Sequence, residues 1–285
     1  MARGKNNQSL IVLLLFIILV AGIALVWYLH RQKSSGTASS VNINPQPQIT
    51  WELGKLLPQN GHCDQIVKHR YYTLCYNETR EQADWVMYRL TEEMTYGTEE
   101  RTDNFRQDKD VITGSARPED YKKSGFDKGH LVPAGDMKWN EEAMSETFLM
   151  SNMSPQRKEL NRGIWKELEE QVRDWARDYD ELYVVAGPLY SNNSLEIGKG
   201  VDVPAYYFKV VVDASYPEYK SIAFLFRNEG SERPVYEFAL SVDSLESISG
   251  FDFLPALPDK TETEIESKCD IFKWFSKDTW HASTP

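Results

Sequence analysis

The sequence predicts an α+β domain with a mainly antiparallel sheet, preceded by one N-terminal transmembrane helix. Strand-like runs come first in the globular part, one long amphipathic helix follows, and further strand-like runs come after it. This order lacks the regular strand–helix alternation of a parallel sheet. Ahead of it, residues 9–29 form an apolar run without a charge, which is the pattern of a membrane span.

Residues 9–29 are long enough to cross a bilayer, since about 20 helical residues at about 1.5 Å each span a hydrocarbon core of about 30 Å. Trp27 and Tyr28 lie at one end, where aromatic rings favour the membrane interface. We expect an uncleaved signal anchor behind a short tail, residues 1–8. A cleaved secretory signal is the alternative, although its apolar core is usually only about 7–15 residues long.

The flanks of the apolar run leave its orientation open, because basic residues occur on both sides. They are Arg3 and Lys5 before the run, and Arg31 and Lys33 after it. Residues 30–50 follow, rich in Ser, Asn, Pro and Gln, a composition typical of a flexible linker. Residues 51–285 contain no second linker and no internal repeat, so we expect one domain there.

The domain opens with strand signals. Residues 66–76 are rich in β-branched and aromatic side chains and predict a first strand, residues 77–79 a turn, and residues 85–90 a second strand. Residues 92–125 are polar and interrupted by glycine and proline, which predicts long surface loops.

One helix is predicted next, over residues 161–179. Its apolar residues recur at steps of three and four, as on the buried face of an amphipathic helix. They are Ile164, Trp165, Leu168, Val172, Trp175 and Ala176. After the helix, the sequence predicts strands at residues 182–186, 206–212 and 221–226.

Charge and cysteine content narrow the function classes. The chain carries 32 basic and 43 acidic residues, a formal net charge of −11. This balance argues against a protein that coats nucleic acid with a broad basic face, but not against an enzyme that engages one phosphate through a divalent cation. The three cysteines form no CxxC pair, which argues against a zinc ribbon. They leave open one disulfide with a free thiol or three thiols, and we expect Cys75 to be a small buried residue.

His130 is the first candidate catalytic residue. It follows Asp127, Lys128 and Gly129, where the glycine permits a tight backbone and the close approach of a ligand. The apolar residues 131–133 give it one buried flank. A neutral imidazole, with an ordinary pKa of about 6.5, suits a general base beside a phosphodiester. A loop histidine considered alone is more often structural.

Asn161 and Glu169 lie in the segment that follows. An Asn at a helix start is usually a cap, but its amide oxygen is also an adequate ligand for Mg²⁺, which keeps most of its waters. Glu169 follows about two helical turns later and could order water around such an ion. By itself, Glu169 is more often a solvated charge.

Three segments in this order, FDKGHLVPAGDM, FLMSNMSPQ and LNRGIWKELEE, resemble the motifs of the DNA/RNA non-specific endonuclease family. That family includes secreted bacterial nucleases and mitochondrial endonuclease G, and has a ββα-metal endonuclease fold. The resemblance extends over nearly all of the globular part, to the segment SVDSLESISGFDFLP. Three linked motifs are a far more specific signal than any one of them.

The resemblance implies a role for each of these residues. His130 would be the general base that activates water, Asn161 the direct ligand of Mg²⁺, and Glu169 would order the waters of the ion. Asn152 would position the His130 segment, and Asp127 would brace its turn. The implied reaction is hydrolysis of DNA and RNA with little sequence preference, leaving 5′-phosphates, with Mn²⁺ as a substitute for Mg²⁺.

Lys128 departs from the family pattern, which usually reads Asp-Arg-Gly-His. Arginine offers a planar fork for two contacts to phosphate, whereas lysine is a flexible point charge. Lys128 would still attract phosphate, with Arg101 or Arg106 as compensation, since the family places a phosphate-binding arginine in that region. Arg106 is included among the predicted catalytic residues.

Two alternatives to an active nuclease remain. One is an inactive relative that serves as a binding module, which only Lys128 supports; the other is a phosphodiesterase for another phosphate ester. For the nuclease we expect DNA and RNA as substrates and membrane contact through the N-terminal helix, with a homodimer left open. The anchored domain would lie outside the cytoplasm, where it spares the cell's own genome, with a mitochondrial membrane as the alternative.

Overall fold

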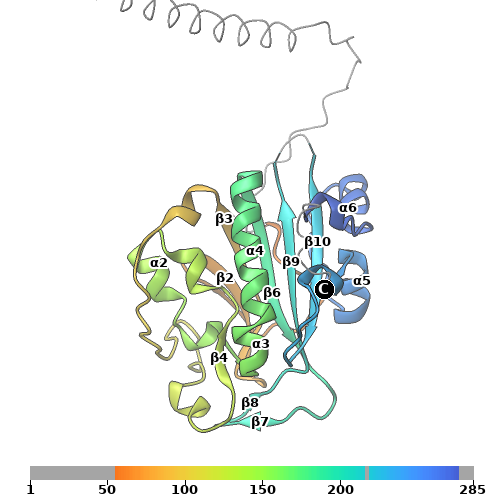
Figure 1. Cartoon of the computed structure of the whole chain (residues 1–285). Helices are drawn as coiled ribbons and strands as arrows, with labels where there is room; N and C mark the ends of the chain where they lie inside the picture. Colours follow the sequence, from red (N-terminus) through yellow and green to blue (C-terminus); the bar gives the residue numbers. More distant parts are fainter. Residues whose placement is uncertain (1–54, 216–217, 276–285) are drawn as a thin grey trace, which may run out of the picture. The chain divides into compact units, whose positions relative to one another are not determined.

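A seven-stranded sheet forms the centre of the domain. The computed structural model describes residues 55–215 and 218–275 (Figure 1). All neighbouring strands are antiparallel, in the order β1-β2-β3-β6-β9-β10-β11. The bounds are β1 (Gln65–Lys68), β2 (Tyr72–Asn77), β3 (Gln82–Thr91), β6 (Glu181–Leu189), β9 (Tyr206–Asp213), β10 (Lys220–Arg227) and β11 (Ala239–Leu240). The predicted α+β class with an antiparallel sheet is confirmed.

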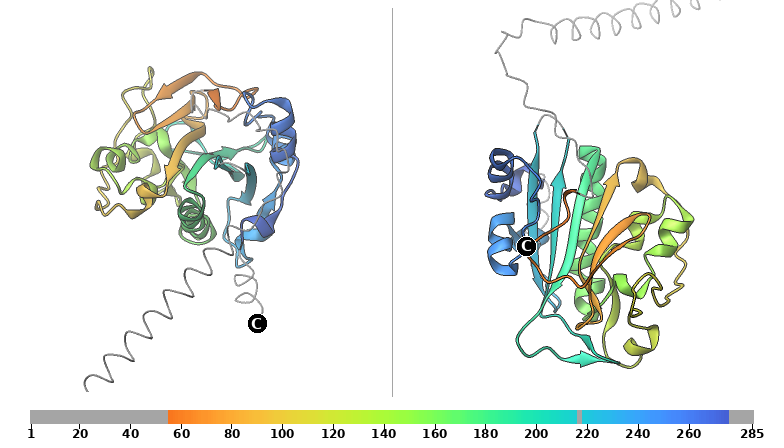
Figure 2. Two further views of the ribbon diagram at one scale, coloured as in Figure 1. Left: turned by 90° about the horizontal axis from the view of Figure 1, so that it is seen from above. Right: turned by 180° about the vertical axis from the view of Figure 1, so that it is seen from behind.

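Helices cover both faces of the sheet. On one face, α4 (Ile164–Tyr179) buries the apolar stripe that the sequence predicted. On the opposite face lie α5 (Val242–Ser249) and α6 (Asp259–Glu266), as Figure 2 shows. Because side chains alternate along a strand, each central strand contributes to a hydrophobic core on either side.

Smaller elements fill the connections. Two short ladders, β4 with β5 and β7 with β8, stand apart from the main sheet. The bounds are β4 (Asp127–His130), β5 (Met153–Gln156), β7 (Glu196–Ile197), β8 (Val201–Asp202), α2 (Glu141–Glu146), α3 (Lys158–Arg162), and for the 3₁₀ helices η2 (Glu93–Tyr96), η3 (Pro118–Tyr121), η4 (Ala134–Met137), η5 (Met150–Asn152), η6 (Val235–Phe238) and η7 (Ile271–Lys273). Residues 92–125 are mostly loops, as predicted, but they are not all at the surface, since Asp108 and Ser115 are buried.

The predicted strand at residues 66–76 is in fact two strands. β1 and β2 form a hairpin, closed by a hydrogen bond from the N–H of His69 to the carbonyl oxygen of Tyr72 at 3.0 Å. The physical reason is a tertiary contact, because the His69 side chain pairs with Asp108 outside the sheet. The turn that follows and the second strand, residues 85–90 within β3, are confirmed.

The predicted helix at residues 161–179 divides at Gly163 into α3 and α4. Gly163 has φ −105° and ψ −119°, outside the helical region. A Cβ at this position would lie 2.5 Å from the carbonyl oxygen of Glu159, so the kink requires glycine. Asn161 therefore belongs to α3 and Glu169 to α4. The three later strands are confirmed as β6, β9 and β10.

The cysteines adopt one of the two arrangements that the sequence left open. Cys63 and Cys75 form a disulfide with their Cα atoms 5.5 Å apart, and Cys269 is a free thiol. Cys75 is fully buried, as expected, but as half of a disulfide rather than as a small apolar residue.

The predicted membrane anchor falls outside the described residues. This applies to the tail 1–8, the span 9–29 and the linker 30–50. Across residues 55–215 and 218–275, no helix combines the length and the apolar character needed to cross a membrane. The anchor, the linker and their boundaries stay predictions.

Candidate active site

His130 is the last residue of β4. The DKGH segment is thus a strand, paired antiparallel with β5 and with His130 opposite Met153, and not the tight turn that the sequence suggested. Gly129 is needed for another reason than the predicted one. A Cβ there would lie 2.2 Å from Oε1 of Gln156. The space beside this glycine therefore holds the protein's own glutamine and not an approaching ligand.

The His130 imidazole lies among aromatic rings. Its centroid is 4.9 Å from that of Phe148 and 5.9 Å from that of Phe105. The side chain is buried, and no described residue forms a hydrogen bond with its Nε2. Burial, and then the positive charges of Arg101 and Lys128, lower the pKa of His130 to about 3. The ring is therefore neutral at physiological pH and has a nitrogen lone pair that can take a proton.

Asn152 fixes the backbone that follows His130. Its Oδ1 accepts a hydrogen bond from the N–H of Val132 at 2.9 Å. Its Nδ2 donates to the carbonyl oxygens of Val132 and Thr147 at 3.0 and 2.9 Å. The side chain is fully buried. Asn152 therefore acts on the path of the chain and not on a ligand, which fits the positioning role that the resemblance implied.

Two cations act on His130 from above the neighbouring rings. The Lys128 ammonium and the Arg101 guanidinium lie 4.5 and 4.8 Å from the centroids of the two rings that border the imidazole. Arg106 is engaged elsewhere, since its Nη1 donates to the carbonyl oxygen of Ser145 at 2.8 Å. Arg101 also pairs with Asp103, through Nε at 2.7 Å, but only Arg101 of the two acts on the pKa of His130, so it is better placed than Arg106 to meet a phosphate beside the histidine.

Asp127 binds α3 instead of bracing a turn, which corrects its predicted role. Its Oδ2 accepts a hydrogen bond from Nδ2 of Asn161 at 3.1 Å, and its two oxygens accept from Arg162 at 2.8 and 3.1 Å. Burial alone would raise the pKa of Asp127, but these bonds hold the pKa below its ordinary value. Asp127 is therefore a carboxylate that ties the start of β4 to α3.

The Asn161 side chain fits a hard divalent cation. Its amide nitrogen is held by Asp127, and within residues 55–215 and 218–275 no hydrogen bond is made by its amide oxygen. Such an oxygen suits Mg²⁺, which binds few protein groups and keeps several waters. The nearby carboxylate of Asp127 adds negative charge that favours a cation.

Glu169 belongs to a group of four charged residues, which we call the charge quartet: the buried Asp136 and Lys209 and the half-buried Glu169 and Arg173. Nη1 of Arg173 donates to Asp136 at 2.8 Å, and the hydroxyl of Tyr88 donates to the same carboxylate at 2.7 Å. Lys209, on β9, is fully buried. Burial raises the pKa of Glu169, while the positive charges of Lys209 and Arg173 oppose this rise.

The structure brings the predicted residues to the two flanks of one segment. Before His130, Asp127 of β4 binds Asn161 of α3. After it, Asp136 of η4 joins the charge quartet that includes Glu169 of α4. Among the described contacts, none joins Glu169 directly to Asn161. Asp127 and Asp136 thus connect the segment of the candidate base to both candidate metal-site residues, Asn161 and Glu169.

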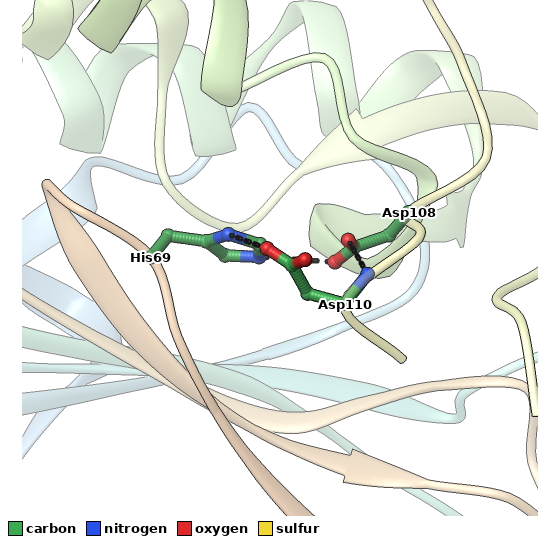
Figure 3. A group of neighbouring side chains, drawn as sticks. All are labelled: His69, Asp108 and Asp110. Carbon is green, nitrogen blue, oxygen red and sulfur yellow. Dashed lines mark hydrogen bonds and ion pairs between the residues drawn. The ribbon is translucent and has the colours of Figure 1, made fainter. Parts of the chain in front are cut away.

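A separate set of potential metal ligands consists of His69, Asp108 and Asp110 (Figure 3). Nε2 of His69 lies 2.9 Å from Asp108, and Nδ1 lies 3.6 Å from Asp110. Ser151 donates to Asp108 at 2.5 Å. Because the two carboxylates meet different ring nitrogens, the geometry suits an ion pair more than a shared cation. We call this group the His69 clamp.

The sequence interpretation missed the rings around His130 and the lysine beside Glu169. Phe105 is a large apolar residue within a polar loop, and this contrast is a signal that it packs on something. Lys209 interrupts the strand sequence YYFKVVVD. A single lysine in a strand that is buried on both faces is costly, which is the signal for a functional role.

Comparison with known proteins points to one family. The family profile described as DNA/RNA non-specific endonuclease matches residues 55–260. A nuclease of Nostoc sp. is 36% identical over 228 residues, which cover 76% of this chain and 81% of that protein. Mitochondrial endonuclease G of Homo sapiens is 32% identical over 207 residues, 67% of this chain and 70% of that protein.

A solved structure agrees with these sequence relationships. The crystal structure of an EndoG/EndoGI complex aligns with a TM-score of 0.65 and 28% sequence identity. The alignment covers 71% of this chain and 90% of that chain.

Proposed function

The chain belongs to the DNA/RNA non-specific endonuclease family and is a non-specific nuclease, and from this premise we propose that His130 is its general base. The proposal depends on one observation. The buried imidazole is neutral, and its Nε2 has no hydrogen-bond partner among the described residues, at a point where Lys128 and Arg101 supply positive charge. A neutral ring in this position can take the proton of an attacking water.

The proposed reaction is hydrolysis of DNA and RNA that leaves 5′-phosphates. The water oxygen forms a bond to phosphorus, His130 accepts its proton, and the bond from phosphorus to the 3′ oxygen breaks. Lys128 and Arg101 would attract the phosphate, and contacts to phosphate carry no base information, so little sequence preference is expected. Arg106 stays a predicted phosphate-binding residue, with less support than Arg101.

The family is metal-dependent, and we propose that the metal of this chain is Mg²⁺, with Mn²⁺ as a substitute. The amide oxygen of Asn161 would bind the ion directly, and Glu169 would hold it through water. When bound, the ion supplies a Lewis acid that offsets the charge developing on the phosphate and on the leaving oxygen. Asp127 contributes by holding the Asn161 amide through its nitrogen.

We also propose that the domain lies outside the cytoplasm, anchored by residues 9–29 as a single-pass membrane protein. The disulfide between Cys63 and Cys75 supports this location, because disulfides persist in oxidising compartments and are rare in the cytosol. A mitochondrial membrane is the alternative. The homodimer stays a prediction that sedimentation of the purified chain would check.

Digestion of plasmid DNA and of RNA by the purified full-length chain tests the proposed function. We expect cleavage that requires Mg²⁺ or Mn²⁺ and falls at least about 100-fold in the His130→Ala variant, because a general base contributes about 10²–10⁴-fold. His62→Ala is the matched control, since His62 is exposed and pairs only with Asp64 among the described residues. Full activity of His130→Ala would remove His130 from the mechanism.

The same digest decides between the nuclease and its alternatives. Lys128 at the usual arginine position is the observation that favours an inactive binding module. Binding of nucleic acid without cleavage, at any concentration of divalent cation, would support that module. Cleavage of a small phosphodiester without cleavage of plasmid or RNA would support a phosphodiesterase.

A further inference from the structure

Three acidic side chains meet between α5 and α6, on the face of the sheet opposite α4. They are Asp243 and Glu246 of α5 and Glu266, the last residue of α6. One oxygen of each lies within 4.8 Å of the others. The two helices lie next to each other over β10 (Figures 1 and 2). The cluster is therefore separate from His130 and the charge quartet, which belong to the α4 side.

Glu266 is the unusual member of this cluster. Its side chain is 2% exposed, and its Oε1 has no hydrogen-bond partner among the described residues. The charged neighbours that act on it are all acids, and burial together with these neighbours raises the pKa of Glu266 to about 9. No ion pair in the described part of the chain joins Asp243, Glu246 or Glu266 to a lysine or arginine.

A buried carboxyl group of this kind needs a proton or a cation. An unpaired buried charge is costly, and several carboxylates at one point repel one another. Ca²⁺ binds carboxylate oxygens at about 2.3–2.6 Å, so ligands on opposite sides of the ion lie about 5 Å apart. The three oxygens lie within 4.8 Å of one another, which is inside this limit. The carbonyl groups at the C-terminal end of α6 add partial negative charge, which also favours a cation.

We propose that Asp243, Glu246 and Glu266 bind a divalent cation of the Ca²⁺ type that joins α5 to α6. Asp243 is exposed and gives the ion a path to the buried Glu266. Glu246 is held in place because its Oε1 accepts a hydrogen bond from the N–H of Phe253 at 2.9 Å. This site stabilises the packing of the two helices on the sheet and takes no part in phosphodiester hydrolysis.

The thermal stability of the purified full-length chain tests the proposal. The measurement uses the Asn161→Ala background, so that Ca²⁺ at the nuclease site does not contribute. We expect Ca²⁺ to bind with a Kd of about 10⁻⁴–10⁻³ M, as in extracellular calcium modules. At 10 mM Ca²⁺ the melting temperature should rise by about 3–10 °C, because ligand binding to the folded state stabilises it.

Glu266→Gln in the same background should abolish the Ca²⁺-dependent rise without lowering the melting temperature measured in EDTA, since without a cation the Glu266 carboxyl group keeps its proton and the neutral amide replaces a neutral group. Glu264→Gln is the matched control, because Glu264 is an exposed acid of the same helix that pairs with Lys260. Asp243→Asn provides a second variant at an exposed position and should weaken Ca²⁺ binding. The proposal would be overturned if Ca²⁺ raised the melting temperature of the Glu266→Gln and Asp243→Asn variants as much as that of the Asn161→Ala parent. It would also be overturned if Ca²⁺ did not raise the melting temperature of the parent.

Discussion

At the scale of single residues, the chemistry depends on the charge state of His130. A base with a pKa of about 3 binds a proton weakly, whereas general bases work best when their pKa lies near the operating pH. After burial, the causes of the low value are the positive charges of Arg101 and Lys128. A bound phosphate would offset these charges, so substrate binding would raise the pKa of His130 toward the range in which it is an effective base.

We therefore expect His130 to titrate near pH 3 in the free protein and at a higher pH when a short single-stranded DNA is bound. NMR of the labelled imidazoles in EDTA, where metal-dependent cleavage is prevented, would measure both values. The exposed His62 is the internal reference. A free-protein pKa near 6.5 would contradict the role of burial, and no rise on DNA binding would contradict the role of the two cations.

At the scale of elements, the charge quartet connects η4, α4 and β9. Asp136 already accepts bonds from Arg173 and Tyr88, whereas the Lys209 ammonium has no hydrogen-bond partner among the described residues and lies 4.6 Å from the centroid of the Trp165 ring. Glu169 and Asp136 both favour the charged form of Lys209, against its burial. Lys209 therefore opposes the effect of burial and lowers the pKa of Glu169, which favours the ionised form of this side chain on the inner face of α4.

Lys209→Met should leave Glu169 protonated at neutral pH, because Lys209 is the strongest of the groups that lower the pKa of Glu169 against burial and Asp136. The metal-free variant should show a carboxylic-acid infrared band, and this band should be absent when Glu169→Gln is added. The acidic limb of the nuclease pH profile should move to higher pH. Lys220→Met is the control, since Lys220 lies over the Tyr179 ring and pairs with Asp213, away from the quartet. An unchanged pH profile without the band would contradict this role of Lys209.

The elements that the sequence predicted well are those with a regular local pattern. The buried strands β6, β9 and β10 and the stripe of α4 follow directly from hydrophobic periodicity. The errors occur where distant residues decide the local structure. The contact with Asp108 removes His69 from the first strand, and the carbonyl group of Glu159 leaves no room for a Cβ at Gly163.

The candidate site was predictable to a similar extent. Motif order was enough to propose His130, Asn161 and Glu169 together. It was not enough to choose between Arg101 and Arg106, because the path of a long loop decides which guanidinium lies near His130.

At the scale of the whole molecule, pH acts on stability through acids of two opposite kinds. Burial would raise the pKa of Asp108, but hydrogen bonds from His69 and Ser151 hold it below 3.8. Its contribution to stability is therefore complete above that value and is lost as the pH falls through the folded pKa. Glu266 is the opposite case, with a pKa raised from 4.5 to about 9. As the pH rises between these values, the unfolded chain releases a proton that the folded protein keeps, so stability falls.

Two variants should separate these opposite effects when melting is measured in EDTA. Asp108→Asn weakens the His69 clamp and should cost about 1–3 kcal/mol at neutral pH, because a buried histidine loses its charged partner. The difference from wild type should shrink below about pH 4, where protonation removes the same charge from the wild-type protein. Glu266→Gln should show the reverse, with no effect below about pH 4.5 and a growing gain in stability toward pH 9. An equal loss for Asp108→Asn at acid and neutral pH would mean that the shape of Asp108, and not its charge, holds the clamp together.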